Sequence, residues 1–175
     1  MPNTVGPNSP LRTLPKKGGL KKKKAKTYSQ IGWCELIDLP SLGLANIHAK
    51  MDSGAATSSI HATRIKQFEQ EGRLWVEFSF RAGAKELTQR IKAPLLDQRK
   101  VRSSNGKEQL RYVIEAQFSL GNLSWAGQIT LANRGSMAFP VLIGRRALKR
   151  GFLVNSGKKW MLGSPVQATN RRDEL

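Results

Sequence analysis

The chain has 175 residues, of which 39% are hydrophobic and 24% are charged, and its formal net charge is +18. This length suits one domain with a hydrophobic core, and no stretch approaches the roughly eighteen consecutive apolar residues that a membrane span needs. A single cysteine, Cys34, excludes an intrachain disulfide and favours a reducing compartment. Since no apolar signal segment lies near the N-terminus, we expect a cytoplasmic protein without membrane contact.

The N-terminal segment differs in composition from the rest of the chain. Residues 1–27 hold eight of the thirty basic residues, four of the eight prolines and no acid. Because such a segment buries too little apolar surface to offset its ordering entropy, we predict a disordered basic tail over 1–28, and a short polar tail over 166–175. A lysine-rich tail is most often only solvated, with weak nucleic-acid contact as the alternative.

The remainder of the chain is basic in its own right. Without the eight basic residues of the tail, a net charge of +18 less 8, or +10, is left on it. Such a charge attracts anions, and the candidate partners are RNA, a ribosome or an acidic peptide. Charge alone does not separate these partners.

From residue 29 onward, short apolar runs alternate with turn signals. Many of the runs have the period-two pattern of strands, and they cover 31–39, 45–51, 74–80, 86–95, 109–120, 123–132 and 139–144. Asn105-Gly106 predicts a hairpin, because both residues accept positive φ. A helical turn is expected within 63–72 and a short helix within 144–151. The fold class is therefore all-β, a small closed or two-layered barrel with one short helix.

The candidate site is the segment D-S-G-A, which begins at Asp52 directly after the predicted strand 45–51. An isolated acid in this setting is most often a turn former. Further along, an apolar strand ends at Gly144, and Arg145 and the predicted helix follow. An apolar strand leading into D-[ST]-G-A, together with a later apolar-apolar-Gly-Arg, resembles the two-part signature of aspartic proteases of the retropepsin kind.

The resemblance extends over nearly the whole predicted domain. The pieces that carry it are, in chain order, IGWCELIDLPSLGL, IHAKMDSGAATSSIHA, LWVEFSF, ITLANRGSMAFPVLIGRRAL and FLVNSGKKWMLG. Residues 31–163 thus resemble the bacterial retropepsin-like family long labelled as ATP-dependent zinc proteases. The resemblance implies a retropepsin-like domain over 29–165, folded as a single-lobe acid-protease barrel.

The resemblance also implies a homodimer. Aspartic proteases place two carboxylates around one water, and the two share a proton because they cannot both ionise at close range. This chain has one D-[ST]-G, and neither Asp38 nor Asp97 is followed by a small hydroxyl and a glycine. We therefore expect a C2 homodimer in which the two Asp52 side chains meet at the symmetry axis.

The family pattern assigns roles to the residues around the catalytic aspartate. The catalytic residue is Asp52, the residues that support its loop are Ser53, Gly54, Ala55 and Thr57, and those that pack beside it are Ile143, Gly144 and Arg145. Gly54 is expected to let the backbone approach the carboxylates, with its N–H available as a donor. Ser53 replaces the more frequent threonine, whose hydroxyl braces the two loops of a dimer, so the bracing is expected to be looser.

Two features of the family pattern are left open. Retroviral members pair the arginine after the late glycine with an acid just beyond the catalytic motif. Ala56 and Thr57 supply no acid, so the partner of Arg145 is unknown. The hairpin predicted over 100–112 is either a flap over the cleft or a plain connection.

No metal, nucleotide or other cofactor is expected. The chain has no Gly-Lys-[Ser/Thr] loop and no HExxH motif. His48 and His61 flank the candidate loop, where we expect them to be structural or exposed. Cys34 is predicted to be a small buried hydrophobe. Aromatic residues that could stack bases are expected in core or sheet-face packing instead, namely Trp75, Trp125, Trp160 and Tyr112.

The favoured function is that of an aspartic-type peptidase, a hydrolase of peptide or protein substrates. Some relatives are linked to an ATP-grasp ligase that adds glutamates to a small-subunit ribosomal protein, and they remove those tails. The resemblance thus makes an acidic, glutamate-tailed ribosomal protein the candidate substrate. The alternative is a catalytically weak retropepsin-fold module that binds the ribosome or RNA.

Overall fold

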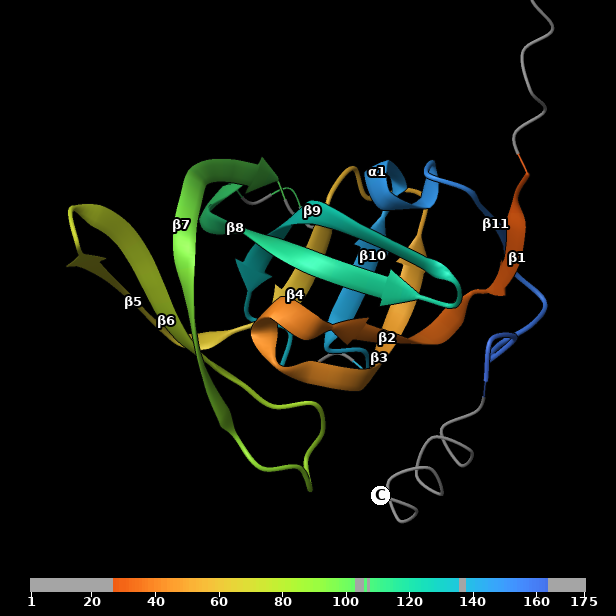
Figure 1. Cartoon of the computed structure of the whole chain (residues 1–175), viewed down its shortest axis with the longest axis horizontal. Helices are drawn as coiled ribbons and strands as arrows, with labels where there is room; N and C mark the ends of the chain where they lie inside the picture. The colour runs from red at the N-terminus through yellow and green to blue at the C-terminus, as the bar shows by residue number, and fades with distance from the viewer. Residues whose placement is uncertain (1–26, 103–105, 107, 136–137, 164–175) are drawn as a thin grey trace, which may run out of the picture.

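The computed structural model describes residues 27–102, 106, 108–135 and 138–163. These residues form eleven strands, a short 3₁₀ helix η1 (Pro40–Leu42) and one short α-helix, α1 (Arg145–Leu148) (Figure 1). The strands are β1 (Ser29–Gly32), β2 (Cys34–Leu39), β3 (Leu44–Asp52), β4 (Ser58–His61), β5 (Thr63–Gln70), β6 (Arg73–Phe80), β7 (Gln89–Arg102), β8 (Glu108–Leu120), β9 (Leu123–Ala132), β10 (Val141–Gly144) and β11 (Phe152–Asn155). The all-β prediction with one short helix is confirmed. The predicted tails lie outside the described residues, except for 27 and 28.

Six of the strands close into a barrel. Their order is β2–β3–β10–β4–β9–β8, and β8 pairs back to β2 at Asp38↔Ser119. Strand β10 lies between β3 and β4, parallel to the first and antiparallel to the second, and β4 is parallel to β9. Because β3 and β4 are the strands on either side of the D-S-G-A segment, β10 brings the later Gly-Arg against that segment.

Buried and exposed residues alternate along the barrel strands, because one face of each strand packs on the core. In β3, Ile47, Ala49 and Met51 are buried, whereas His48 and Lys50 are exposed. Each large apolar side chain buried in this way contributes about 1.5–3 kcal/mol to the free energy of unfolding. The pattern fixes the register of β3, because a slip of one residue would turn its apolar face to solvent.

Aromatic side chains pack in the core and on the sheet faces, as predicted. Trp125 stacks on Phe118 with ring planes at 2° and centroids 5.3 Å apart. Tyr112 packs partly buried against the core, and the ring of Trp160 lies 5.0 Å from that of His48. Trp75 is half-buried on β6.

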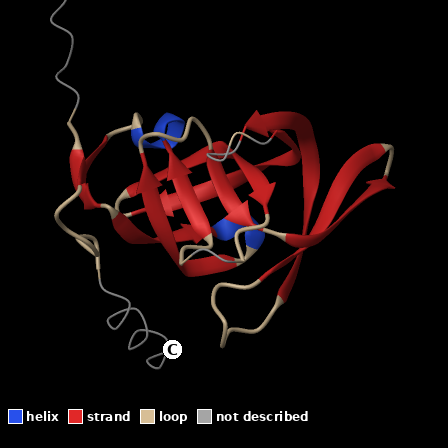
Figure 2. Cartoon of the chain, turned by 180° about the vertical axis from the view of Figure 1, so that it is seen from behind, coloured by secondary structure: helices blue, strands red, loops and turns tan. Residues whose placement is uncertain are grey.

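The helical turn expected within 63–72 is wrong, because this segment is strand β5. It pairs with β6, and the connecting residues Glu71 and Gly72 have φ of 53° and 70°, as a tight hairpin turn requires. The helix-like three-residue spacing of half-buried Ile65 and Phe68 comes from a register shift at the start of β5, where Arg64 has a φ of 51°. The hairpin projects from the barrel on the side opposite to the β1–β11 pair (Figures 1 and 2).

The hairpin signalled by Asn105-Gly106 is confirmed as the antiparallel pair β7–β8, which extends to Arg102↔Glu108. Its turn residues 103–105 and 107 lie outside the described residues. The flap therefore stays a prediction.

The parallel pair β1–β11 is fastened to the barrel through a buried carboxylate. Glu35 has no exposed surface, and it accepts hydrogen bonds from the N–H groups of Gly32 (2.6 Å), Met161 (2.9 Å) and Leu162 (3.1 Å). These donors compensate for the loss of water around the charge. The adjacent Cys34 is buried as predicted, and burial, followed by the charge of Glu35, raises the pKa of its thiol. None of the helices in the described part of the chain has the length and hydropathy of a transmembrane segment.

Candidate active site

Asp52 is the last residue of β3, and its side chain is half-buried. Its Oδ1 accepts hydrogen bonds from the N–H groups of Gly54 (3.0 Å) and Ala55 (3.1 Å). These bonds orient the carboxylate through one oxygen and leave Oδ2 for a further partner. The same geometry is that of an Asx turn, so the loop alone does not separate a turn former from a catalyst.

Gly54 lies close to the carboxylate, as the family pattern implies. A Cβ at this position would lie 3.2 Å from Oδ1 of Asp52, which is tighter than an ordinary contact. A side chain at residue 54 would therefore require the Asp52 carboxylate to shift by a few tenths of an ångström. The adjacent Ser53 is exposed.

Strand β10 fixes the candidate loop from the other side. Gly144 pairs with Asp52 in the parallel register, and its N–H donates to the buried Oγ of Ser58 at 3.1 Å. A Cβ on Gly144 would lie 2.4 Å from the carbonyl carbon of Thr57, so no residue with a side chain fits there without moving backbone. Ile143, the preceding residue, is fully buried in the core.

The partner of Arg145, which the sequence left open, is the backbone of the candidate loop. Its Nη1 donates to the carbonyl oxygen of Ser53 at 2.9 Å and, over a longer contact of 3.5 Å, to that of Gly54. Its backbone N–H donates to the carbonyl oxygen of Ala55 at 2.8 Å. Backbone carbonyl oxygens thus take the place of the acid that retroviral members pair with this arginine. Arg145 clamps the loop through hydrogen bonds from both its side chain and its backbone N–H.

The other acids considered from the sequence are engaged elsewhere. Oδ1 of Asp38 accepts the N–H of Asn46 at 2.7 Å, across β2 and β3. Asp97 forms an ion pair with Arg99 on β7 at 2.6 Å, and this bond is the main reason that the pKa of its carboxyl lies below the usual value. Neither acid forms a pair with Asp52, so one chain contributes one loop carboxylate.

The two histidines do not form a joint site. His48 is exposed, whereas Nδ1 of His61 accepts the backbone N–H of Arg134 at 2.9 Å. Burial, and then the charges of Arg81 and Arg134, lower the pKa of His61 and favour the neutral ring. Across the described residues, no group of three or more His, Cys, Asp or Glu side chains is arranged to hold a metal ion.

Sequence reasoning missed Arg134, whose charge interacts with that of Asp52, and Arg111, whose charge interacts with that of Arg134. Half-buried Arg134 donates from Nη1 to Oγ of Ser59 and from Nε to the carbonyl oxygen of Phe139, both at 3.3 Å. Burial is the main cause that lowers its pKa, Arg111 lowers it further, and Asp52 acts in the opposite direction. In a chain with thirty basic residues, no local motif distinguishes these two arginines from the solvated ones.

Comparison with known proteins places the chain among retropepsin-like proteins. The family model described as RimB-like, retropepsin-like aspartic endopeptidase RimB, matches residues 30–164. Proteins named probable alpha-L-glutamate ligase from Shewanella pealeana and Parasynechococcus marenigrum are 39% and 40% identical to the chain over 133 residues. This region is 75% of the chain, but the chain spans only 28% of the length of each of these relatives.

The fold also matches a solved structure. The crystal structure of Lpg0085 from Legionella pneumophila, a protein of unknown function, gives a TM-score of 0.65 with 22% sequence identity. The match covers 77% of this chain and 98% of that one. At this level of identity the likeness concerns the fold alone.

Proposed function

Since the chain belongs to the RimB-like family of retropepsin-like aspartic endopeptidases, we propose that it is an aspartic endopeptidase that acts as a C2 homodimer, with Asp52 of each copy in the catalytic dyad. The domain responsible corresponds to residues 29–165. The observation that carries the proposal is the clamped loop. Asp52 is held by the N–H groups of its own loop, and the loop is held in turn by Gly144 and Arg145 of a distant strand and helix.

The proposed mechanism follows from two carboxylates that share one proton. The ionised Asp52 takes a proton from a water held between the two chains, and the water oxygen attacks the peptide carbonyl carbon. The protonated Asp52 of the other copy donates its proton to the carbonyl oxygen, which gives a neutral tetrahedral diol. Collapse of the diol breaks the C–N bond when the leaving nitrogen is protonated and a diol hydroxyl returns its proton to the dyad.

For the substrate, we infer a glutamate-rich tail of a protein, with a ribosomal protein as the candidate, in the cytoplasm. Two observations support this choice. The relatives that contain a matching region are named for glutamate ligation, so a peptidase of the same lineage would suit the product of such a ligase. The chain is also strongly basic, with a net charge of +18, which raises the local concentration of an acidic substrate and its association rate. Weak nucleic-acid contact through residues 1–28 belongs to the same proposal.

The test is cleavage of a glutamate-tailed peptide by the full chain and by Asp52→Asn, with products measured by mass spectrometry. Asn keeps an oxygen that can accept the N–H groups of Gly54 and Ala55, so the variant is expected to fold with an unchanged melting temperature. Turnover should fall by at least about 1,000-fold, because the amide neither takes up nor returns the shared proton. Asp97→Asn is the matched control, since Asp97 lies on the β7–β8 hairpin and pairs with Arg99. It should keep nearly full activity.

The alternative function makes a different prediction for the same experiment. A catalytically weak module that binds the ribosome or RNA would give equally low turnover in the wild type and in Asp52→Asn. Equal residual activities of the two proteins, with both folded and dimeric, would remove the peptidase proposal.

A further inference from the structure

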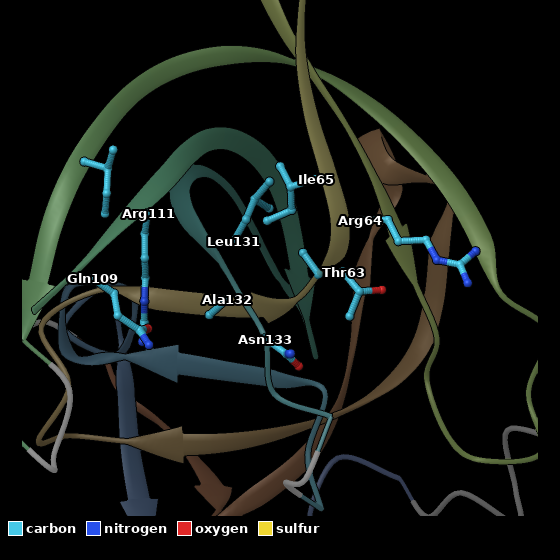
Figure 3. Close-up of a pocket in the computed structure, with 10 residues that line it drawn as sticks. Thr63, Arg64, Ile65, Gln109, Arg111, Leu131, Ala132 and Asn133 are labelled. Atoms are coloured by element: carbon cyan, nitrogen blue, oxygen red, sulfur yellow. The ribbon is translucent and has the colours of Figure 1, made fainter. Parts of the chain in front are cut away.

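A cavity of about 510 Å³ lies between the start of β5, the start of β8 and the end of β9 (Figure 3). Arg111 and Arg64 contribute to its lining, and the residues that line it include no acid. A neighbouring cavity of about 360 Å³ shares Thr63, Arg64 and Asn133 with it, adds Arg81, and again has no acid in its lining. This part of the surface is thus concave and carries positive charge only.

Arg111 is poorly satisfied within the described part of the chain. Its Nε is shielded from solvent and has no hydrogen-bond partner there. The guanidinium donates from Nη2 to Oε1 of Gln109 at 3.3 Å, and the two polar ends lie beside each other at one side of the cavity (Figure 3). None of the ion pairs formed among the described residues includes Arg111. Buried donors are nearly always paired, so the guanidinium of Arg111 lacks part of the compensation that a half-buried charge requires, and an anion in the cavity would supply its missing charge partner.

A second half-buried guanidinium strengthens this indication. The charge of Arg134 interacts unfavourably with that of Arg111 and favourably with that of Asp52, so Arg134 lies within electrostatic range of both groups. Its bonds to Ser59 and Phe139 hold it in place between β4 and the segment that precedes β10. Two guanidinium groups that repel each other in a partly desolvated place are stabilised together by one anion.

We propose that Arg111 and Arg134 form a carboxylate-binding subsite, which receives an acidic group of the peptide whose scissile bond lies at Asp52. This inference rests on the proposed function and specifies which residues select its substrate. A guanidinium presents a planar pair of N–H donors that matches the two oxygens of a carboxylate. This match explains why both positions hold arginine better than a general need for positive charge does.

The shape of the cavity favours an acidic side chain or chain end over a nucleic-acid phosphate. Ile65 and Leu131 lie beside each other in the cavity, and Ala132 adds a further apolar surface (Figure 3). Apolar walls suit the methylene groups of a glutamate, whose carboxylate would then reach Arg111. The Asp52 carboxylate, which lies within electrostatic range of Arg134, would repel a phosphate, with its greater negative charge, more strongly than a carboxylate.

The test measures peptide binding by fluorescence anisotropy in the Asp52→Asn background, so that it does not depend on turnover. The probes are a labelled glutamate-tailed peptide and the same peptide with glutamine in place of glutamate. Each is used with a free and with an amidated C-terminus, because a side-chain carboxylate and a terminal carboxylate share one chemistry. The second substitution is Arg111→Met, which keeps the stem and removes the fork.

We expect Arg111→Met to weaken binding of the glutamate-tailed peptide by about tenfold to a hundredfold, the range for a charged hydrogen bond. Binding of the amidated glutamine peptide should change less than about twofold. Arg73→Met is the matched control, because it removes the same charge from an exposed site at the far end of the β5–β6 hairpin, and it should change both affinities less than about twofold. Arg111→Lys should give an intermediate loss, since it keeps the charge and removes the fork.

The two sources of the carboxylate give different patterns. If the loss caused by Arg111→Met persists in the amidated glutamate peptide, the subsite binds a side chain; if it follows the free C-terminus, the subsite binds the chain end. If Arg111→Met weakened the binding of the glutamate peptide and of the amidated glutamine peptide equally, the proposal would be overturned. Equal affinities of the two peptides for the Asp52→Asn protein that keeps Arg111 would also overturn it. The latter comparison needs no variant at Arg111 and holds even if Arg111→Met fails to fold. A selective loss of binding, together with no cleavage of either peptide by the chain that keeps Asp52, would support the subsite while contradicting the peptidase.

Discussion

Replacement of Gly144 by alanine is the most direct test of the clamped loop. The new Cβ would lie 2.4 Å from the carbonyl carbon of Thr57, 2.6 Å from its oxygen and 2.9 Å from the backbone nitrogen of Ser58. Ordinary contacts of a Cβ begin at about 3.4 Å, so the closest of these pairs must separate by about 1 Å. All three atoms belong to the backbone, which cannot move away by changing a rotamer.

The cost follows from the general range for overpacking. Extra methyl groups in a well-packed core cost about 1–3 kcal/mol, and backbone neighbours place Gly144→Ala at the upper end, about 3 kcal/mol. The φ of Gly144 is −85°, which alanine adopts freely, so the variant also gains about 0.4–1 kcal/mol from a less flexible unfolded chain. The net expectation is a loss of about 2–3 kcal/mol in the free energy of unfolding, a large share of the usual 5–15 kcal/mol.

The assay is urea unfolding of the wild type and Gly144→Ala, followed by circular dichroism, with peptide cleavage measured in parallel. Gly83→Ala serves as the control, because its Cβ would lie 3.7 Å from Cγ of Glu86, an ordinary contact, and it should change the stability by less than about 0.5 kcal/mol. The turnover of Gly144→Ala should fall well below that of the wild type. The reason is that the new Cβ displaces the backbone of Thr57, which lies in the loop that starts at Asp52. A stability of Gly144→Ala within 0.5 kcal/mol of the wild type, as expected for Gly83→Ala, would refute the reasoning.

Two further predictions concern buried polar groups outside the candidate loop. Glu35→Ala should lower the free energy of unfolding by about 3 kcal/mol or more in the same urea assay, because three backbone N–H groups lose their acceptor; a loss below about 1 kcal/mol would contradict this. The pKa of His61 is lowered in the folded state by burial and by Arg81 and Arg134, so the unfolded chain binds its proton more readily and stability should fall as the pH drops below the unfolded pKa of about 6.5. His61→Asn keeps an acceptor near the N–H of Arg134 and should reduce the loss measured between pH 7.5 and 5.5, whereas an unchanged loss would assign the pH dependence to other groups.

The barrel strands were predictable where one face of a strand is buried. In β3 the alternation of buried and exposed residues is complete from Ile47 to Met51, and that pattern is a local property of the sequence. β5 was missed because its register shift lets Ile65 and Phe68 share a side at a helix-like spacing. A bulge is set by the pairing strand, and single-sequence periodicity does not contain it.

The residues of the candidate site were also predictable only in part. Asp52 and Gly144 were found because each lies in a short motif, and the family resemblance joined them. The hydrogen bonds from Arg145 to the loop could not be predicted from the sequence. Every residue has a backbone carbonyl oxygen, so no residue type marks the ones that act as acceptors. Arg111 and Arg134 come from β8 and from the segment after β9, and only the closed barrel brings Arg134 within electrostatic range of both Arg111 and Asp52.

In the proposed function, an acidic dyad and an acidic substrate repel each other, and the proposed role of the two arginines is to offset this repulsion. Two like charges in one partly desolvated site repel each other, and this repulsion would weaken the binding of an acidic substrate. Arg134 interacts favourably with Asp52 and is held in place by Ser59 and Phe139, so its charge offsets this repulsion without losing side-chain entropy on binding. Arg111, which lines the cavity and forms no ion pair among the described residues, is the proposed partner of the incoming carboxylate. We therefore expect Arg134 to compensate for the charge of Asp52 and Arg111 to recognise the substrate, two roles that a single basic residue would not serve.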